Sequence, residues 1–439
     1  MCPSRRPADS LRPSRAVRSM PDGTRGPLVE LARRMRDDGQ EVIDLSLGDP
    51  AAHGFTAPTT VMEEVERHLR DACAYTPETG TSEARAAVAH HYRERRGLAG
   101  SSPSDVCLGN GVSELASLAT QALLDPGDQV LVPSPSYPLW RDCVALTGAV
   151  AVPYPCREDR GWRPDPAGTA ARVGPRTRAL VVVNPGNPTG ALWPADVLER
   201  VVAVARAGGL ALLADEIYDE IRYDSLPFTS TAALAPDLLC LTFSGLSKFC
   251  RMPGYRAGWM LASGPHAVKD AYLSAVRRLA ALRLCPNAPA QSAVPKALSA
   301  PVLAGTRRAT EPGGALTARR DTAHEALRRI EGASCVRPEA AFYAYPRLPL
   351  ARRRATPDFA RALLRHAHVL VTPGSVFSGR DDGHVRLTTL AGPAELAEGI
   401  DRIGAFLAEE RAPDRAPPAA PHREDPLPAP LRKAARLSQ

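Results

Sequence analysis

The sequence predicts an α/β fold in which a mainly parallel, seven-stranded sheet forms a large domain, followed by a smaller α+β domain. Three observations carry this prediction. Short apolar runs alternate with helical patterns through the middle of the chain, the runs are apolar throughout, and the pattern changes near residue 300. Continuous apolar strands separated by helices are typical of parallel sheets covered on both faces. A chain of 439 residues has room for two hydrophobic cores.

Seven apolar runs are expected to form the strands of this sheet. In chain order they are residues 105–108, 129–132, 149–153, 179–183, 210–214, 238–243 and 257–262. Four segments with a helical distribution of apolar residues are expected as helices, namely 113–124, 138–147, 194–207 and 266–284. Side chains that directly follow the strands can converge on one crevice at the sheet edge.

The chain is expected to divide into five segments. Residues 1–24 and 411–439 are rich in Pro, Ala and Arg, have little to bury, and are expected to form disordered basic tails. Residues 59–299 hold the expected sheet and form the large domain. Residues 300–410, with long helices and short strands, form the small C-terminal domain, which residues 25–58 are expected to join.

The distribution of charge argues against a nucleic-acid-binding face. Six Arg and two Asp give residues 1–25 a charge of +4, and six basic against three acidic residues give residues 411–439 a charge of +3. Together these tails account for the whole formal charge of +7, so residues 26–410 are formally neutral. No run of 18 apolar residues predicts a membrane span. The nine scattered cysteines contain no Cys-x-x-Cys pair, which indicates reduced thiols in a cytoplasmic protein and no metal site.

The most informative single residue is Lys248. The chain contains four lysines, and every other basic residue in the Lys+Arg total of 55 is arginine. A lysine kept in such a chain can do what arginine cannot: lose its proton, attack a carbonyl and form a Schiff base. Asp215 follows another expected strand, with Tyr218 three residues later, and Asn184 follows a third and opens the stretch Asn-Pro-Gly-Asn-Pro-Thr-Gly (184–190). Together these residues suggest a site for pyridoxal 5'-phosphate (PLP).

A PLP site needs a lysine for the cofactor carbonyl, an acid for the pyridine nitrogen and a cradle for the phosphate. Lys248 and Asp215 are the candidates for the first two, and Tyr218 could hydrogen-bond the phenolic oxygen. The Gly-rich turn 109–113 follows a strand and opens a helix, which offers free N–H groups to an anion. Further donors are Ser244, Ser247 and Arg256. A Gly-rich turn of this kind usually binds no ligand. The prediction therefore rests on the whole set of candidate residues in their order along the chain.

Six motifs make the chain resemble the fold-type I, class I/II aminotransferases, and among them the bacterial glutamate–pyruvate (alanine) aminotransferase branch. The motifs are Gly-Asn-Gly-Val-Ser-Glu-Leu (109–115), Leu-Val-Pro-Ser-Pro-Ser-Tyr-Pro-Leu-Trp (131–140), Asn-Pro-Gly-Asn-Pro-Thr-Gly-Ala (184–191), Ala-Asp-Glu-Ile-Tyr-Asp (214–219), Leu-Ser-Lys through Gly-Trp-Met (246–260) and Arg-Leu-Cys-Pro-Asn-Ala-Pro-Ala-Gln (283–291). The resemblance runs from about residue 25 to 407. It implies a PLP-transferase fold and makes residues 59–299 the PLP-binding domain.

The resemblance also implies roles for individual residues at the cofactor. Lys248 would be the Schiff-base lysine, with Asp215 and Tyr218 holding the ring. Tyr137 would stack on the ring, and Asn187 would contact both cofactor and substrate. The expected phosphate ligands are Gly111, Val112, Ser113 and Arg256.

Three further residues take their implied roles from the same resemblance. Tyr75 matches a tyrosine that crosses to the phosphate of the neighbouring subunit, which implies a homodimer. Arg386 matches the arginine that clamps the substrate α-carboxylate, for which its planar fork is suited. Gly48 would let the backbone approach the substrate.

Two positions depart from the family pattern. Asp22 stands where related enzymes carry a tyrosine three residues before Arg-Gly-Pro, so an aromatic that closes over the substrate is missing. Ala340 replaces the glycine of a more usual Pro-x-Gly-Ala, and its methyl group is expected to narrow a turn near the pocket. Both departures bear on the substrate and leave the cofactor prediction unchanged.

The leading function is therefore transfer of an amino group between an L-amino acid and a 2-oxo acid, with alanine, glutamate, pyruvate and 2-oxoglutarate as the implied substrates. Cofactor motifs cannot separate this from a lyase or an amino-acid oxidase on the same fold, because substrate pose selects the reaction. A non-catalytic effector-binding regulator is a third alternative. It would need a DNA-binding domain, and residues 1–24 are too short and too Pro-rich for one.

Overall fold

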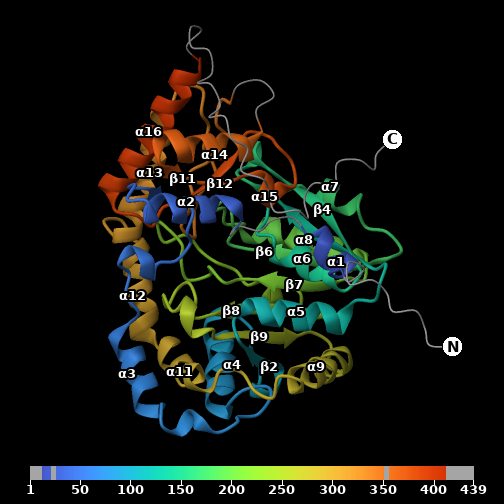
Figure 1. Ribbon diagram of the computed structural model, residues 1–439. Helices are drawn as coiled ribbons and strands as arrows, with labels where there is room; N and C mark the ends of the chain where they lie inside the picture. Colours follow the sequence, from blue (N-terminus) through green and yellow to red (C-terminus); the bar gives the residue numbers. More distant parts are fainter. Residues whose placement is uncertain (1–11, 21–25, 351–354, 412–439) are drawn as a thin grey trace, which may run out of the picture.

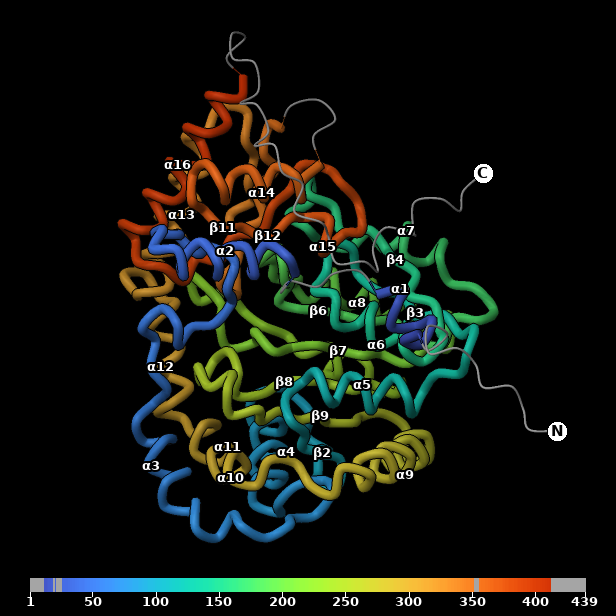
Figure 2. Tube along the Cα trace, viewed as in Figure 1, coloured from blue at the N-terminus to red at the C-terminus, as the bar shows by residue number. Residues whose placement is uncertain are grey.

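The computed structural model describes residues 12–20, 26–350 and 355–411 (Figures 1 and 2). The main sheet has eight strands in the order β2-β9-β8-β7-β6-β3-β4-β5. Their bounds are Val106–Gly109 (β2), Gly258–Ser263 (β9), Cys240–Gly245 (β8), Ala211–Asp215 (β7), Thr177–Val183 (β6), Gln129–Ser134 (β3), Val150–Arg157 (β4) and Arg163–Pro164 (β5).

The predicted α/β class is confirmed. Strands β8, β7, β6, β3 and β4 pair in parallel, whereas β9 runs antiparallel to both β8 and β2. All seven predicted strands lie in this sheet, with ends that differ from the expected ones by a few residues. The eighth strand, β5, pairs antiparallel with β4. It has only two residues, which is too short to leave an apolar pattern in the sequence.

The continuous apolar character of the strands follows from burial on both sheet faces. In β6, Leu180 and Val182 enter one core, while Val181 and Val183 enter a second core on the opposite face. The first core includes residues of α4 (Ser82–Arg96), α8 (Ala195–Ala207) and α11 (Ala293–Ala297). The second includes residues of α5 (Val112–Leu123), α6 (Leu139–Leu146) and α9 (His266–Ala281). Period-two alternation therefore places apolar side chains in both cores.

A third core lies beside the main sheet, among the helices at the top of Figure 1. It includes residues of α13 (Ala315–Arg329), α14 (Thr356–Ala367) and α16 (Pro393–Arg411). Strands β10 (Tyr343–Ala344), β13 (Val385–Thr388) and β12 (Thr372–Pro373) form a small antiparallel sheet there. The N-terminal strand β1 (Ile43–Asp44) pairs in parallel with β11 (Val369–Leu370). Residues before 50 thereby contribute to the same body as residues after 300.

Seven further α-helices lie within the described residues. They are α1 (Arg15–Ser19), α2 (Pro27–Asp37), α3 (Thr59–His68), α7 (Pro166–Ala170), α10 (Ala288–Gln291), α12 (Ala300–Thr310) and α15 (Ser375–Ser378). The short helix α1 falls within the segment that was expected to lack structure, whereas residues 1–11, 21–24 and 412–439 of the two expected tails lie outside the described residues. Of the helices in the described ranges, none combines the length and apolar character needed to cross a lipid bilayer. The eight described cysteines are free thiols.

Candidate active site

Lys248 follows β8 and points its amine at the backbone of the N-terminal segment. Its Nζ donates a hydrogen bond to the carbonyl oxygen of Gly48 at 2.9 Å and lies 5.9 Å from the ring centroid of Tyr218. Burial, reinforced by the charges of Arg386 and Arg256, lowers the pKa of Lys248 to about 8. An ordinary lysine has a pKa near 10.4, so at neutral pH roughly a hundredfold more of this amine is uncharged. Lys248 is thus prepared for nucleophilic and proton-transfer chemistry.

Asp215 is the last residue of β7, the strand next to β8. Its Oδ2 accepts a hydrogen bond from Trp140 Nε1 at 3.0 Å, and its Oδ1 accepts one from the backbone N–H of Ile217 at 3.3 Å. Burial raises the pKa of Asp215 to about 6, against the opposing effect of these two bonds and of the Lys248 charge. The side chain is therefore mainly a buried carboxylate at neutral pH. Such a group is stabilised by a cationic partner.

Tyr218 and Tyr343 connect the sheet edge to the small antiparallel sheet. Their hydroxyl oxygens lie 2.7 Å apart, so one hydroxyl donates to the other. Burial raises the pKa of both phenols, which keeps them neutral near pH 7. A Cβ atom added to Gly48 would stand 2.5 Å from the Tyr343 hydroxyl oxygen. Only glycine therefore lets this backbone pass between Tyr343 and Lys248.

Arg386 on β13 is a buried cation held by neutral groups. Its guanidinium donates to the carbonyl oxygen of Ser46 at 2.7 Å and to Oδ1 of Asn187 at 3.2 Å. It lies 4.7 Å from the ring centroid of Tyr343 and 4.8 Å from that of Phe377. Within the described ranges Arg386 makes no ion pair, and its buried Nε has no hydrogen-bond partner. A carboxylate from outside the chain would supply the missing charge and acceptors.

The turn before α5 offers a place for a second anion. Gly111 has a φ of +86°, and a Cβ there would overlap the Arg256 guanidinium. Arg256 donates to the carbonyl oxygens of Asn110 at 3.1 Å and Pro253 at 2.9 Å. Val112 begins α5, so the free N–H groups of a twelve-residue helix open beside this guanidinium. Ser113, in the first turn of α5, is exposed.

The other predicted residues lie at different depths. Ser244 is buried in β8, and Ser247 is partly buried one residue before Lys248. Tyr137 directly precedes Pro138, the N-cap residue of α6, and is 36 % exposed. Tyr75 precedes α4 and is 79 % exposed.

Three functional contacts could not be read from local sequence. Trp140 belongs to a recognised motif, but nothing in that motif shows that its indole bonds Asp215. Tyr343 bonds Tyr218 across 125 positions of sequence, and Ser46 reaches Arg386 across 340. Ser46 contributes a backbone carbonyl, so its side-chain type carries no signal at all.

The comparisons with known proteins agree with this geometry. The family model described as aminotransferase class I and II matches residues 40–403. The chain belongs to this family. It is 44 % identical over 393 residues to an alanine aminotransferase of Mycobacterium tuberculosis, covering 88 % of this chain and 90 % of that protein. It is 40 % identical over 388 residues to the glutamate-pyruvate aminotransferase AlaA of Escherichia coli, covering 87 % and 94 %.

Solved structures show the same family. An aminotransferase from Escherichia coli superimposes with a TM-score of 0.88 at 38 % identity, covering 91 % of this chain and 98 % of that one. An alanine aminotransferase from Pyrococcus furiosus gives 0.85 at 33 % identity, covering 91 % and 100 %. The protein is therefore a PLP-dependent aminotransferase of fold type I, which confirms the predicted family, fold, enzyme class and cofactor.

The residues present in this aminotransferase fit PLP. Among the described residues, no cationic side chain hydrogen-bonds the buried carboxylate of Asp215, and a protonated pyridine nitrogen would be such a partner. The amine of Lys248 has a lowered pKa, as a group that attacks an aldehyde requires. The space that a Cβ of Gly111 would fill is taken by the Arg256 guanidinium, so this guanidinium and the N–H groups that open α5 could bind one phosphate together.

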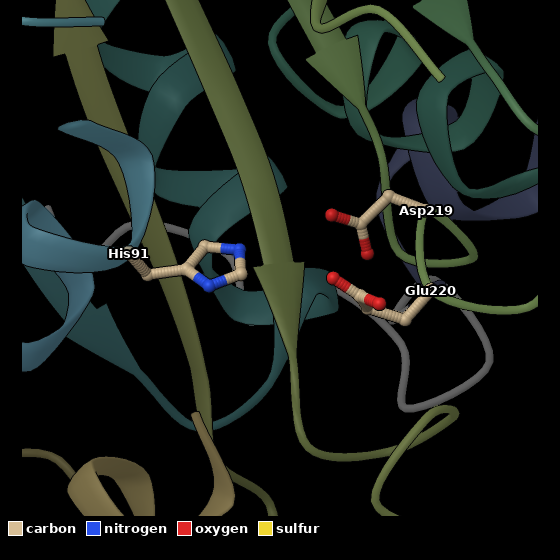
Figure 3. Close-up of side chains that lie close together, drawn as sticks. All are labelled: His91, Asp219 and Glu220. Atoms are coloured by element: carbon tan, nitrogen blue, oxygen red, sulfur yellow. The ribbon is translucent and has the colours of Figure 1, made fainter. Parts of the chain in front are cut away.

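A second buried group of ionisable residues supports the segment that carries Tyr218. The ring of His91 faces the carboxylates of Asp219 and Glu220 (Figure 3). Arg96 Nη2 lies 2.5 Å from Asp219 Oδ2 and 2.6 Å from Glu220 Oε1. Burial lowers the pKa of His91 to about 3, so this imidazole is neutral. Because Arg96 already supplies the positive charge between the two carboxylates, we interpret the group as an ion pair that anchors residues 216–220 to α4.

Proposed function

We propose that this aminotransferase exchanges amino groups between alanine or glutamate and pyruvate or 2-oxoglutarate. The observation that carries this proposal is the buried Arg386 guanidinium, which lacks a carboxylate partner in the described ranges and lies beside Asn187. Each of these four substrates has an α-carboxylate that the Arg386 guanidinium can bind. The names of the relatives at 40–44 % identity support alanine and glutamate in particular.

In this proposal Lys248, Asp215 and Tyr218 act at the cofactor. When bound, PLP supplies an electron sink that stabilises negative charge at the substrate Cα. Asp215 keeps the pyridine nitrogen protonated, and Trp140 fixes the carboxylate in place with its 3.0 Å bond. Tyr218 donates toward the phenolic oxygen, with Tyr343 as its neighbour at 2.7 Å.

Lys248 moves the proton in each half-reaction. In the first half-reaction its neutral amine would take the proton from the substrate Cα and deliver it to the cofactor carbon, and in the second it would move a proton in the reverse direction, which requires a pKa near the working pH. The lowered pKa of about 8 supports this role, because an appreciable fraction of the amine is then free at neutral pH. The carbonyl oxygen of Gly48, 2.9 Å away, orients the amine.

The remaining residues bind and orient. Arg386 and Asn187 hold the α-carboxylate, and Gly48 lets the substrate approach the backbone. Tyr137 covers the cofactor ring, and Asn187 also contacts the ring. The phosphate is held by the helix opening and by donors that surround it, which are Gly111, Val112, Ser113, Ser244, Ser247 and Arg256. Closeness of the Gly111 turn to the Arg256 guanidinium supports this last assignment.

The active unit in this proposal is a homodimer in which Tyr75 crosses to the phosphate of the neighbouring subunit. An aromatic side chain that is 79 % exposed in a single chain supports an intersubunit role. Mixing Tyr75→Phe chains with Lys248→Ala chains should restore activity, because one site of each hybrid is then intact. Absence of recovery after verified subunit exchange would remove the crossing from the proposal.

We further propose a cytoplasmic location and a division into a large domain of residues 59–299 and a small domain of residues 25–58 and 300–410. The pairing of β1 with β11 supports the inclusion of residues 25–58 in the small domain.

The proposed cytoplasmic location is supported by the free thiols of all eight described cysteines, which are compatible with a reducing compartment.

A panel of amino acids tests the substrates. Holoenzyme is mixed with alanine, glutamate, valine, arginine and phenylalanine in single turnovers, and the absorbance of the cofactor reports the rate. Alanine and glutamate should react fastest. Alanine fails as the physiological donor if it reacts more than about a hundredfold slower than the best amino acid, a gap near 2.7 kcal/mol.

A further inference from the structure

Strand β13 and the residue just before it make two contacts with loops that follow strands of the main sheet. His384 directly precedes β13 and pairs with Arg347, and Arg386 lies two residues further on. Side chains two apart on a strand point to the same face. Arg386 reaches Asn187, in the loop after β6, and His384 reaches Glu158, in the turn after β4. Both contacts measure 3.2 Å.

The surroundings of His384 select the doubly protonated ring. Its Nδ1 lies 2.8 Å from Asp382 Oδ1, and its Nε2 lies 3.2 Å from Glu158 Oε2. Ionised carboxylates only accept hydrogen bonds, so both ring nitrogens must donate, which only the imidazolium can do. Tyr345 stacks on the ring at 4.8 Å, and Trp162 meets it edge-on at 5.1 Å. The side chain is only 5 % exposed, so its orientation is fixed on all sides.

The charges around the His384 ring also favour its doubly protonated form. Burial alone would lower the pKa of His384, but the hydrogen bonds to Asp382 and Glu158 outweigh it and raise that pKa above its ordinary value. His384 in turn holds the pKa of Glu158 below its ordinary value, and Arg347 acts on Glu158 in the same direction. Ser334 donates to the other oxygen of Glu158 at 3.0 Å.

The backbone of His384 is also hydrogen-bonded to the segment that carries Phe377, one of the two aromatic residues that pack against Arg386. Its carbonyl oxygen accepts a hydrogen bond from the N–H of Gly374 at 2.8 Å. Gly374 is the cap residue of α15, and α15 carries Phe377, whose ring lies against Arg386. Movement of His384 would therefore shift Arg386 along β13 and Phe377 along α15 together.

We propose that His384 is a positioning residue for the carboxylate clamp: its imidazolium, held between Asp382 and Glu158, fixes the strand that carries Arg386 against the main sheet. The inference rests on the proposed role of Arg386. Affinity for a substrate carboxylate then depends on the protonation of His384. Because the hydrogen bonds to Asp382 and Glu158 raise the pKa of His384, its imidazolium persists to a higher pH than that of an ordinary histidine and is lost as the pH rises through the raised pKa. A neutral ring can keep only one of its two bonds, and the strand is then less firmly held.

Equilibrium binding tests this without turnover. PLP-loaded enzyme is titrated with 2-oxoglutarate between pH 6 and pH 9, and intrinsic protein fluorescence reports the dissociation constant. His384→Gln keeps a neutral donor but removes the charge, so 2-oxoglutarate should bind about tenfold more weakly at pH 6.5. The difference from wild type should shrink as the pH rises. Any other group of the site that titrates in this range contributes equally to both proteins and cancels in that difference.

Two further variants sharpen the test. Glu158→Gln should reproduce the weakening, and because Glu158 is 28 % exposed its replacement tests the contact even if His384→Gln folds poorly. His266→Gln is the matched control, since His266 on α9 is an exposed histidine paired with Asp270. It should leave the dissociation constant and its pH profile unchanged.

The outcomes separate this inference from the function on which it rests. If Arg386→Lys weakens 2-oxoglutarate binding but His384→Gln and Glu158→Gln lower only the melting temperature, His384 is structural and the inference is wrong. If Arg386→Lys binds as tightly as wild type, the proposed clamp itself is wrong. If wild type binds no 2-oxoglutarate, the proposed substrate is wrong, and the same titration with pyruvate decides the role of His384.

Discussion

The proposed cofactor end, which contains Asp215 and Lys248, and the proposed carboxylate clamp, in which Ser46 and Asn187 contact Arg386, are assembled in different ways. Asp215 and Lys248 stand at and just beyond the ends of two adjacent parallel strands, so the backbone ladder of the main sheet fixes their spacing. The clamp draws Ser46 and Asn187 to Arg386 across 340 and 199 positions of sequence. One region is set by local structure within a sheet, whereas the other exists only after distant segments have packed.

The two regions also differ in electrostatics. The cofactor end holds a carboxylate and an amine whose pKa values burial has moved to about 6 and about 8. The clamp holds a single buried cation, surrounded by a carbonyl, an amide and two aromatic rings. We therefore expect changes at the cofactor end to act on kcat and on the cofactor spectrum, and changes at the clamp to act on KM.

The largest effect is expected for Lys248→Ala. Loss of the amine removes both the cofactor attachment and the proton carrier, so kcat should fall by about ten-thousandfold or more. Steady-state assays with alanine and 2-oxoglutarate measure the loss. Lys296→Ala, at an exposed position of α11, is the control and should retain wild-type turnover. Wild-type rates in Lys248→Ala would refute the assignment of the catalytic lysine.

Asp215→Asn is expected to keep the cofactor bound yet slow the reaction. A neutral amide cannot stabilise a protonated pyridine nitrogen, so proton abstraction should slow by roughly a thousandfold, or about 4 kcal/mol. Single-turnover absorbance at saturating glutamate reports this step. Asp196→Asn, exposed on α8, provides the comparison. A change of less than about tenfold in Asp215→Asn would contradict the proposed ion pair.

The same contrast explains what the sequence could reveal. Asp215 was proposed because it directly follows the apolar run 210–214, and Lys248 because it is one of only four lysines in an arginine-rich chain and lies five residues beyond the apolar run 238–243. Arg386 was identified only through its motif, since 51 arginines give no reason to select one by charge. Tyr343 and Ser46 were not found at all. Their roles come from tertiary packing against Tyr218 and Arg386, for which no short-range pattern exists.

Arg386→Lys tests the clamp directly. Lysine keeps the positive charge but cannot offer two parallel N–H groups to a carboxylate. KM for both the amino acid and the oxo acid should rise by about a hundredfold, with kcat falling less than about tenfold. An equal loss in kcat with unchanged KM would show that Arg386 acts in the transition state alone. The contrast between the two regions would then not hold.

The smallest effect on the kinetic constants is expected for Tyr343→Phe. Tyr343 contacts Tyr218 at the cofactor end and Arg386 in the clamp, and this substitution removes only one of the two contacts. Its hydroxyl bonds Tyr218 at 2.7 Å, while its ring lies 4.7 Å from the Arg386 guanidinium. Phenylalanine keeps the ring over Arg386 and removes only the hydroxyl. The clamp should therefore be preserved, with KM within about twofold of wild type, while kcat falls about fivefold as Tyr218 loses a neutral hydrogen bond.

Steady-state kinetics of Tyr343→Phe at several pH values measure both constants. Tyr343→Leu is the informative companion, because it removes the aromatic face as well and should raise KM in addition to lowering kcat. If Tyr343→Phe raised KM as much as Tyr343→Leu does, the hydroxyl rather than the ring would set the clamp. The cofactor end and the carboxylate clamp would then respond as one hydrogen-bonded unit through Tyr218, instead of as two separately assembled regions.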